Sequence, residues 1–330
     1  MAHGGRTVNI NSRSEILNTL KGCISLNFAE RALIFVLFTF PHFSHLESAF
    51  LFNFQTLAGS KILKDHKWKN HKLAILVPFR DRFEELMEFA PHMDKFLTLQ
   101  NINHNIFIIN QVDQFRFNRA QLINIGFLQT KHDYDYIAMH DVDLLPLNNQ
   151  LNYDYPDFGP FHVASPDLHP RYHYATFVGG ILLVKREHYE QVDGMSNKYW
   201  GWGLEDDEFF VRLKEAKLNI TRPSNMQTDT TNTFSHIHDK VHRKRDTVKC
   251  YNQREATRKR DRETGLHDVS YDLVSQHNLT IDSVPVTVFN VRLKCDKTKT
   301  PWCDCTQISD NYQHHKINSC IFLIPLVIFS

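Results

Sequence analysis

The chain has 330 residues, of which 42% are apolar, and its 38 Lys and Arg nearly balance its 37 Asp and Glu, leaving a net charge of +1. This length and apolar content suffice for one large hydrophobic core or for two fused lobes. So even a charge balance gives no argument for a nucleic-acid partner.

The N-terminal segment is apolar in two pieces. Residues 32–40 are strongly apolar, but a proline, two histidines and a glutamate interrupt the run before it resumes at 49–54. A membrane-spanning helix needs about 20 apolar residues in succession. We interpret the segment either as a degenerate signal anchor or as a buried apolar stretch, and the sequence leaves both open. The apolar run at 321–329 is too short to span a membrane.

Short apolar runs then alternate with helical spacing. The runs at 72–78, 102–109 and 134–139 predict buried strands, and the spacing over 80–99 and 118–128 predicts helices between them. Strands that alternate with helices predict an α/β fold with a mostly parallel central sheet flanked by helices. Ligands bind such sheets at the carboxyl ends of the strands.

Two aspartates, Asp141 and Asp143, follow the third predicted strand. Their i, i+2 spacing points both carboxylates to one face of an extended segment. Asp-x-Asp is also common in ordinary loops, so the pair by itself is weak evidence. Its place after a strand predicts a substrate or metal site.

The most distinctive stretch is residues 199–209, YWGWGLEDDEF, where two tryptophans alternate with two glycines and lead into four consecutive acids. Glycines allow the backbone to hinge, and crowded carboxylates raise one another's pKa. We interpret the segment as a mobile lid beside a catalytic acid or base. A core tryptophan followed by an acidic helix N-terminus is the alternative, and both interpretations can hold.

His236 and His238 repeat the i, i+2 spacing, so their imidazoles can hold one cation if the segment is extended. The chain has 20 histidines, so an exposed pair is the alternative. Carboxylate and imidazole together suit a divalent ion of intermediate hardness, and we expect Mn²⁺.

Four of the six cysteines lie near the C-terminal end: Cys250, Cys295, Cys303 and Cys305. They lack the paired C-x-x-C units of common zinc sites and could staple a C-terminal lobe in an oxidising compartment. The sequons at Asn219 and Asn278 are compatible with a lumenal glycoprotein. The basic strip, residues 240–262, is either a solvated face with interspersed acids or a contact for an anionic substrate or product.

Six motifs together resemble the β-1,4-galactosyltransferase family over residues 64–305. They are VPFRDR at 77–82, FNRA at 117–120, HDVD at 140–143, FVGG at 177–180, WGWGLEDDE at 200–208 and HIH at 236–238. The histidine pair and the leucine before Glu205 are most similar to the xylosylprotein branch. The resemblance implies a GT-A fold, UDP-galactose as donor, Mn²⁺, and inverting transfer to O4 of β-xylose on proteoglycan core proteins, in synthesis of the glycosaminoglycan linker.

The resemblance also implies where the donor binds. The donor set is Pro78, Phe79, Arg80, Arg82, Phe117, Arg119, Asp141, Val142 and Trp202. The planar guanidinium of arginine suits phosphate and ribose oxygens. For the arginines, an ordinary surface ion pair with Asp81 or Glu84 is the alternative.

The implied metal ligands are Asp143, His236 and His238. The implied acceptor set is Tyr172, Tyr174, Phe177, Trp202 and Glu205, with Phe177 where the xylose-specific branch more often has tyrosine. Inverting transfer requires a single carboxylate to remove the acceptor proton. We expect Asp206 to be this base, with Glu205 and Asp207 binding sugar hydroxyls or orienting it.

The resemblance further implies disulfides joining Cys250 to Cys305 and Cys295 to Cys303. The chain divides into residues 1–63, an N-terminal segment with a degenerate signal anchor or stem; residues 64–305, a GT-A galactosyltransferase catalytic domain; and residues 306–330, an unassigned tail. A single-pass type II membrane protein on the lumenal face of the Golgi is expected, with its anchor poorly defined.

Two other functions stay open. One is a β-1,4-galactosyl- or N-acetylgalactosaminyltransferase that acts on N-acetylglucosamine acceptors. The other is a non-catalytic relic that binds UDP-sugar, which the intact Asp143, Asp206, His236 and His238 disfavour.

Overall fold

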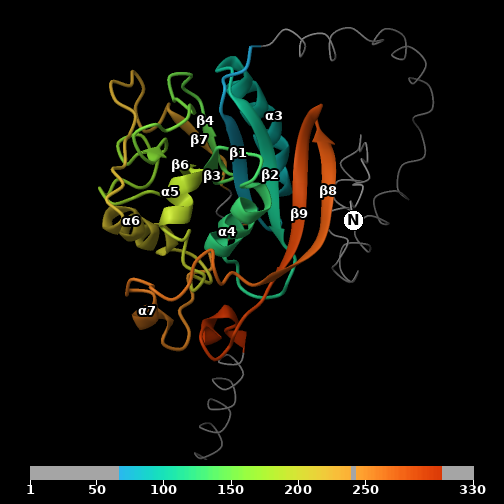
Figure 1. The fold of residues 1–330 in the computed structure, drawn as a ribbon, viewed down its shortest axis with the longest axis vertical. Helices are drawn as coiled ribbons and strands as arrows, with labels where there is room; N and C mark the ends of the chain where they lie inside the picture. Colours follow the sequence, from blue (N-terminus) through green and yellow to red (C-terminus); the bar gives the residue numbers. More distant parts are fainter. Residues whose placement is uncertain (1–66, 239–242, 307–330) are drawn as a thin grey trace, which may run out of the picture.

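The computed structural model describes residues 67–238 and 243–306 (Figure 1). A mixed seven-stranded sheet has the strand order β5-β6-β3-β1-β2-β9-β8. Its strands are β1 Lys72–Phe79, β2 Asn103–Gln111, β3 Tyr136–His140, β5 Phe161–His162, β6 Ile181–Lys185, β8 Tyr271–Ile281 and β9 Val284–Leu293. A separate two-stranded sheet pairs β4 Leu144–Pro146 with β7 Phe234–His236.

The helices lie between these strands. They are α3 Phe83–Leu99, α4 Arg119–Thr130, α5 Arg186–Gln191, α6 Glu205–Glu215 and α7 Gln253–Ala256, with a 3-10 turn at Pro301–Cys303. The three predicted strands and two predicted helices in the first half of the described chain are therefore confirmed. Only their ends move by a few residues.

The centre of the sheet is parallel and its flanks are not. β1 pairs in parallel with β2 and β3, and β2 with β9, whereas the β3–β6, β5–β6 and β8–β9 pairings are antiparallel. The crossovers through α3 and α4 produce the parallel pairs. The tight turn between β8 and β9, with positive φ at Asp282 and Ser283, forces an antiparallel hairpin. The expected α/β fold is confirmed, with its parallel part confined to the centre.

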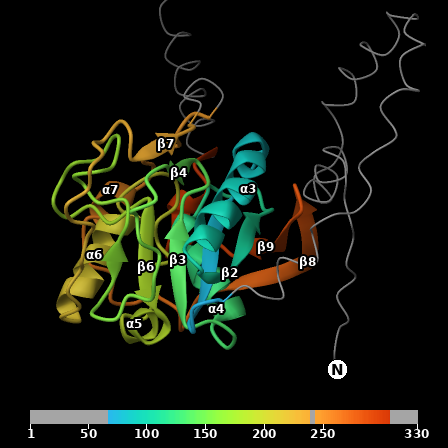
Figure 2. The same ribbon diagram turned by 90° about the horizontal axis from the view of Figure 1, so that it is seen from above.

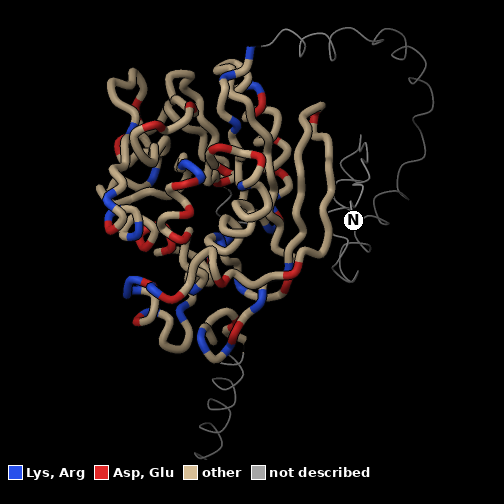
Figure 3. Tube along the Cα trace, in the orientation of Figure 1, with Lys and Arg blue, Asp and Glu red and all other residues tan. Residues whose placement is uncertain are grey.

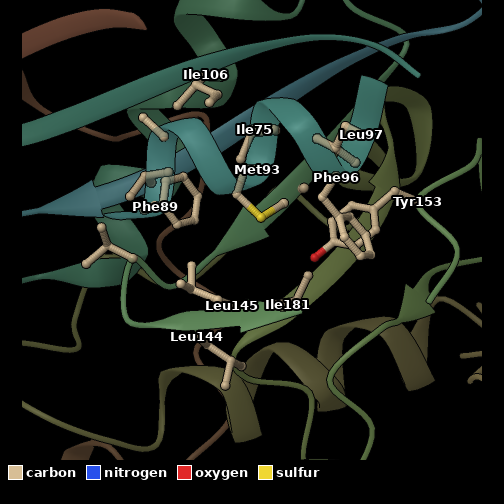
Figure 4. Close-up of a cluster of buried hydrophobic side chains, with 14 of the residues drawn as sticks. Ile75, Phe89, Met93, Phe96, Leu97, Ile106, Leu144, Leu145, Tyr153 and Ile181 are labelled. Carbon is tan, nitrogen blue, oxygen red and sulfur yellow. The ribbon is translucent and has the colours of Figure 1, made fainter. Parts of the chain in front are cut away.

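Helices cover both faces of the sheet (Figure 2). α3 packs on one face through residues spaced three and four apart, among them Leu86, Phe89 and Met93. α4 contributes to the core on the other face, together with residues of α5 and α6. Figure 4 shows the α3 side, where Phe89, Met93 and Phe96 lie over strand residues such as Ile75. Alternate β1 side chains enter opposite cores, so β1 is buried on both sides.

The C-terminal part of the described chain is cross-linked to the rest. Disulfides join Cys250 to Cys305 and Cys295 to Cys303, the pairs that the family resemblance implied. Residues 1–63, and the tail beyond residue 306, fall outside the described residues. In the described ranges, no helix is both long and apolar enough to cross a membrane.

Candidate active site

The site is built where β3 ends. Asp141 and Asp143 follow β3 directly and lead into β4. β4 pairs with β7 so that Leu144 lies opposite His236, and the amide of Ile237 donates to the carbonyl oxygen of Asp143 at 3.0 Å. This small sheet joins the aspartate motif to the histidine motif, which are far apart in the sequence.

The three predicted metal ligands converge. Oδ2 of Asp143 lies 3.9 Å from Nε2 of His236 and 3.0 Å from Nδ1 of His238. The two imidazole rings stack with their centroids 5.6 Å apart. Atoms that share an ion at about 2.1 Å stand about 3 Å from one another. Across the described ranges, no three His, Cys, Asp or Glu side chains meet the geometry of a finished metal site, so His236 must move closer to bind with the others.

The charge states of these residues favour a metal. Burial lowers the pKa of His236, Asp143 opposes that effect, and the guanidinium groups of Arg171 and Arg245 lower it further. A neutral imidazole is the form that binds metals. One carboxylate oxygen and two neutral nitrogen donors fit a divalent ion of intermediate hardness, such as Mn²⁺.

Arg119 and Asp141 form an ion pair next to the metal ligands. Nε of Arg119, at the start of α4, donates to Oδ1 of Asp141 at 2.8 Å. Burial opposes the charge of Arg119, but Asp141, Glu205 and Asp206 raise its pKa above the ordinary value. Its Nη1 is buried and has no protein partner. This atom is therefore available to a ligand oxygen.

Asp206 lies in the first turn of α6, after Leu204 in a left-handed conformation. Gly179 is so close that a Cβ on it would stand 2.6 Å from Oδ2 of Asp206. Burial raises the pKa of Asp206 to about 8, and the neighbouring Glu205 and Asp207 carboxylates add to the effect. A carboxylate with a pKa this high can act as a general base near neutral pH.

The acids on either side of Asp206 have different surroundings. Burial raises the pKa of Glu205, which Arg119 opposes, and Oε2 of Glu205 is buried without a protein partner. The hydroxyl of Tyr174 hydrogen-bonds to Asp207. Burial, with Asp206 and Asp207 nearby, raises the pKa of Tyr174. Tyr174 thus connects the predicted acceptor residues to the acids of α6.

An aromatic cluster, Tyr172, Tyr174, Phe177 and His169, stands beside α6. The ring of Phe177 lies 5.1 Å from that of Tyr172, 5.5 Å from Tyr174 and 5.1 Å from His169. Burial lowers the pKa of His169 to about 3, so its Nδ1 can accept the amides of Arg171 and Tyr172 at 3.0 and 3.1 Å. The hydroxyl of Tyr172 is buried without a protein partner, so it is available to an acceptor.

The two tryptophans before α6 differ. Trp200 is 1% exposed and belongs to the core, whereas Trp202 is 44% exposed. The amide of Trp202 donates to the carbonyl of Asp246 at 2.8 Å, and Nζ of Lys249 donates to the carbonyl of Trp202 at 3.1 Å. Both expectations for the segment therefore have a residue: Trp200 is structural, and Trp202 is an exposed ring held against the basic strip.

The predicted donor arginines turn inward. Arg80 donates to the carbonyl oxygens of Phe115 and Asp113 at 2.8 and 3.2 Å, and its guanidinium lies 5.9 Å from the ring of Phe117. Arg82 pairs with Glu85 at 3.2 Å. Neither partner matches the acids that the sequence suggested as alternatives. Arg80 holds the loop after β2 in place, which positions Phe117 and the start of α4.

Three further donor residues lie in the interior. Phe79 is 1% exposed and Val142 is 6% exposed, and both belong to the core under α3. Pro78 is also buried, in the part of β1 that extends past its pairing with β3. Their side chains shape the wall behind the site.

Arg116, which the sequence did not single out, joins the lid segment to the basic strip. Its Nε and Nη2 donate to the two carboxylate oxygens of Asp246 at 2.6 and 2.9 Å, and Nη1 donates to the carbonyl of Trp302 at 3.0 Å. Gly201 has a φ of +79°, and a Cβ on it would overlap the guanidinium of Arg116. A glycine between two tryptophans signals such a close approach, but the sequence cannot name the partner. Gly179 was missed for the same reason.

Comparison with known proteins decides the family. Residues 42–156 match the family model described as the N-terminal region of glycosyl transferase group 7, and residues 159–239 match the one described as the N-terminal domain of galactosyltransferase. β-1,4-Galactosyltransferase 7 of Drosophila melanogaster is 63% identical over 243 residues, which are 73% of this chain and 76% of that protein. The chain belongs to the β-1,4-galactosyltransferase family. The human β-1,4-galactosyltransferase 7 is 56% identical over 73% of both chains. The xylosylprotein 4-beta-galactosyltransferase of Caenorhabditis elegans is 52% identical over 71% of this chain and 82% of that protein.

Solved structures agree in fold. The catalytic domain of Drosophila β-1,4-galactosyltransferase 7, in complex with xylobiose, superposes with a TM-score of 0.71 at 64% identity, covering 72% of this chain and 100% of that one. A mutant of the same Drosophila enzyme, in complex with manganese, UDP-Gal and xylobiose, superposes equally well. The likeness confirms the GT-A fold of this family member.

Proposed function

We propose that this protein transfers galactose from UDP-galactose to O4 of β-xylose, with inversion and with Mn²⁺ as cofactor. The single observation that carries the proposal is the meeting of Asp143, His236 and His238 in a fold that also presents Asp206 with its raised pKa. The Drosophila relative is described with manganese, UDP-Gal and xylobiose together, which supports the same donor, metal and acceptor sugar here.

Asp143, His236 and His238 are the residues that would hold the metal. Its chemical contribution, when it is bound, is to neutralise the negative charge that develops on the leaving diphosphate. The buried and unpartnered Nη1 of Arg119 is placed to bind an oxygen of the donor, while Asp141 fixes the guanidinium through Nε. The ion pair therefore orients Arg119 and leaves its other nitrogen free for the ligand.

Asp206 acts as the general base in this proposal. It accepts the proton of the xylose O4 hydroxyl as O4 forms a bond to the anomeric carbon of galactose, and the bond from that carbon to UDP breaks on the opposite face. One carboxylate suffices because no covalent sugar–enzyme intermediate forms. Glu205, with its unpartnered Oε2, and Asp207, which binds Tyr174, orient the base and the sugar hydroxyls.

The aromatic cluster forms the acceptor side. Aromatic rings stack on the apolar face of a pyranose, and Trp202, the half-exposed ring before α6, is placed to close over donor and acceptor. Tyr172 offers its unpartnered hydroxyl. Phe177 is 3% exposed and packs among the other rings, so it acts through packing and offers no hydroxyl to the sugar.

The physiological acceptor in this proposal is a xylosylated proteoglycan core protein in the Golgi lumen. The two disulfides support an oxidising compartment. Asn219 and Asn278 are both exposed, as N-glycosylation requires. Residues 64–305 would be the catalytic domain of a type II membrane protein, with its anchor and stem in residues 1–63.

The test is an acceptor panel with UDP-galactose, with and without Mn²⁺. A β-xyloside should be galactosylated only with metal, and faster than an N-acetylglucosaminide. Preference for N-acetylglucosamine would assign the protein to the other acceptor class. If UDP-galactose binds but neither acceptor turns over, the protein is a non-catalytic relic and the proposal fails.

A further inference from the structure

The basic strip, residues 240–262, contains cations with very different surroundings. Arg243 pairs with Glu84, and Arg260 pairs with Glu208. Figure 3 shows Lys and Arg segments next to Asp and Glu segments along this part of the chain. These pairs match the ordinary interpretation of the strip as a solvated face with interspersed acids. They leave no net attraction for an anion at those positions.

Arg245 is different. No carboxylate of the described chain pairs with it, although its neighbour Arg243 is fully engaged. Its guanidinium carbon lies 5.0 Å from the ring of Trp202 and 5.9 Å from the ring of Tyr172. Two aromatic faces thus hold a charged group over the predicted acceptor side without neutralising it.

Arg171 approaches the same tyrosine. Its guanidinium carbon lies 5.8 Å from the ring of Tyr172, and its Nη1 is buried without a hydrogen-bond partner. Among the described residues it forms no ion pair either. A buried N–H of a charged group that stays unpaired costs free energy, and a ligand oxygen removes that cost.

The two arginines therefore place two uncompensated positive charges around Tyr172. The acids of α6 do not pair with them: Glu208 is engaged by Arg212 and Arg260. A guanidinium binds a carboxylate or phosphate more strongly than a neutral oxygen, often with two hydrogen bonds. The missing partner is accordingly a negatively charged group supplied by a substrate.

We propose that Arg171 and Arg245 form a subsite for a carboxylate on the acceptor, carried by the peptide next to its sugar. The inference rests on the proposed function, because it deepens the acceptor specificity of that site. The acceptor is favoured over the donor because both arginines stand at Tyr172 and one stacks on Trp202, whereas Arg119 is the arginine beside the aspartate motif.

The test compares two xylosylated peptides that differ only in having Glu or Gln beside the xylosylated residue. The measured quantity is the ratio of kcat/KM for the Glu peptide to that for the Gln peptide. Partly exposed ion pairs of this kind predict a ratio of about three to ten in the unchanged protein. High salt should reduce it toward one. The ratio should fall to about one in the Arg171→Gln, Arg245→Gln double variant.

Arg258→Gln is the matched control, because Arg258 is exposed in the same strip and forms no ion pair with any described residue; it should keep the full ratio. A ratio of one in the unchanged protein, or an unaltered ratio in the double variant, would overturn the subsite. So would a higher KM for UDP-galactose with equal losses on both peptides, because the arginines would then bind the donor. Turnover of the Gln peptide reports separately on the proposed function.

Discussion

Asp206 and Glu208 lie two residues apart in the first turn of α6, yet the fold treats them in opposite ways. Glu208 is 5% exposed, and its carboxylate binds Nε of Arg212 at 2.9 Å and Nη1 of Arg260 at 2.7 Å. Asp206 has no such cation, and its pKa rises to about 8. One acid is stabilised as a charge, while the other is held in a state that favours taking up a proton.

The difference follows from the two faces of the helix. Glu208 points toward the core, where Arg212 also binds the carbonyl oxygens of Gly194 and Thr264. Asp206 points toward Gly179 and the site. A run of four acids therefore contains residues with structural and with chemical roles, and their burial and partners tell them apart.

The largest expected effect is on catalysis. Asp206→Asn removes the proton acceptor but keeps the shape, so kcat should fall by about 10² to 10⁴-fold. Binding of UDP-galactose, measured by calorimetry, should persist. The melting temperature should not drop, because a neutral side chain suits this position. Near-normal turnover in this variant would remove Asp206 from the role of base.

Glu208→Ala should instead destabilise the fold, because Arg212 is left buried and charged without its partner. The expected loss is about 3 to 5 kcal/mol in the free energy of unfolding, measured by denaturant titration. Glu215→Ala is the control, since Glu215 is exposed and pairs with Arg260 and Arg262 at the surface. It should cost less than about 1 kcal/mol. Equal losses would mean that burial of the Glu208 pair does not matter.

Gly201→Ala should weaken the contact between the lid segment and the basic strip. A side chain at φ +79° is strained and would overlap Arg116, so we expect a loss of about 2 to 4 kcal/mol, seen as a lower melting temperature and lower activity. Gly203→Ala is the matched control: its φ is +95°, but nothing lies within 4 Å of the added Cβ. It should cost only the backbone strain, about 1 to 2 kcal/mol. If both variants behave alike, the Arg116 contact is unimportant.

The pH dependence offers a smaller and more specific test. Because the base must be unprotonated, kcat/KM should rise with pH and level off above about 8, the pKa of Asp206 in the free enzyme. Below that value it should fall about tenfold per pH unit.

The effect on stability has a defined sign. The folded pKa of Asp206 lies above the unfolded value, so the protonated carboxyl stabilises the fold at low pH, and this contribution is lost as pH rises toward 8. Asp206→Asn should remove that part of the pH dependence of the melting temperature. A kcat/KM profile that stays flat well into the acidic range would contradict the assignment of the base.

Much of the fold could be predicted because strands such as β1 and helices such as α3 carry their own periodicity. The apolar spacing of α3 follows one face of a helix, and β1 is apolar throughout because both its faces are covered. The antiparallel flanks were not foreseen, because β5 has only two residues and β6 only five, too few to show a pattern.

The sequence by itself determined the kinds of residues at the site: paired acids after a strand, a spaced pair of histidines, and acids at a helix start. Local spacing and residue chemistry are enough for that. Only the tertiary structure decided that β4 and β7 bring Asp143 to His236, that Arg80 turns inward, and that Arg171 and Arg245 stand unpaired at Tyr172. Those outcomes depend on partners distant in the sequence, and the burial and charge of such partners exist only once the chain has folded.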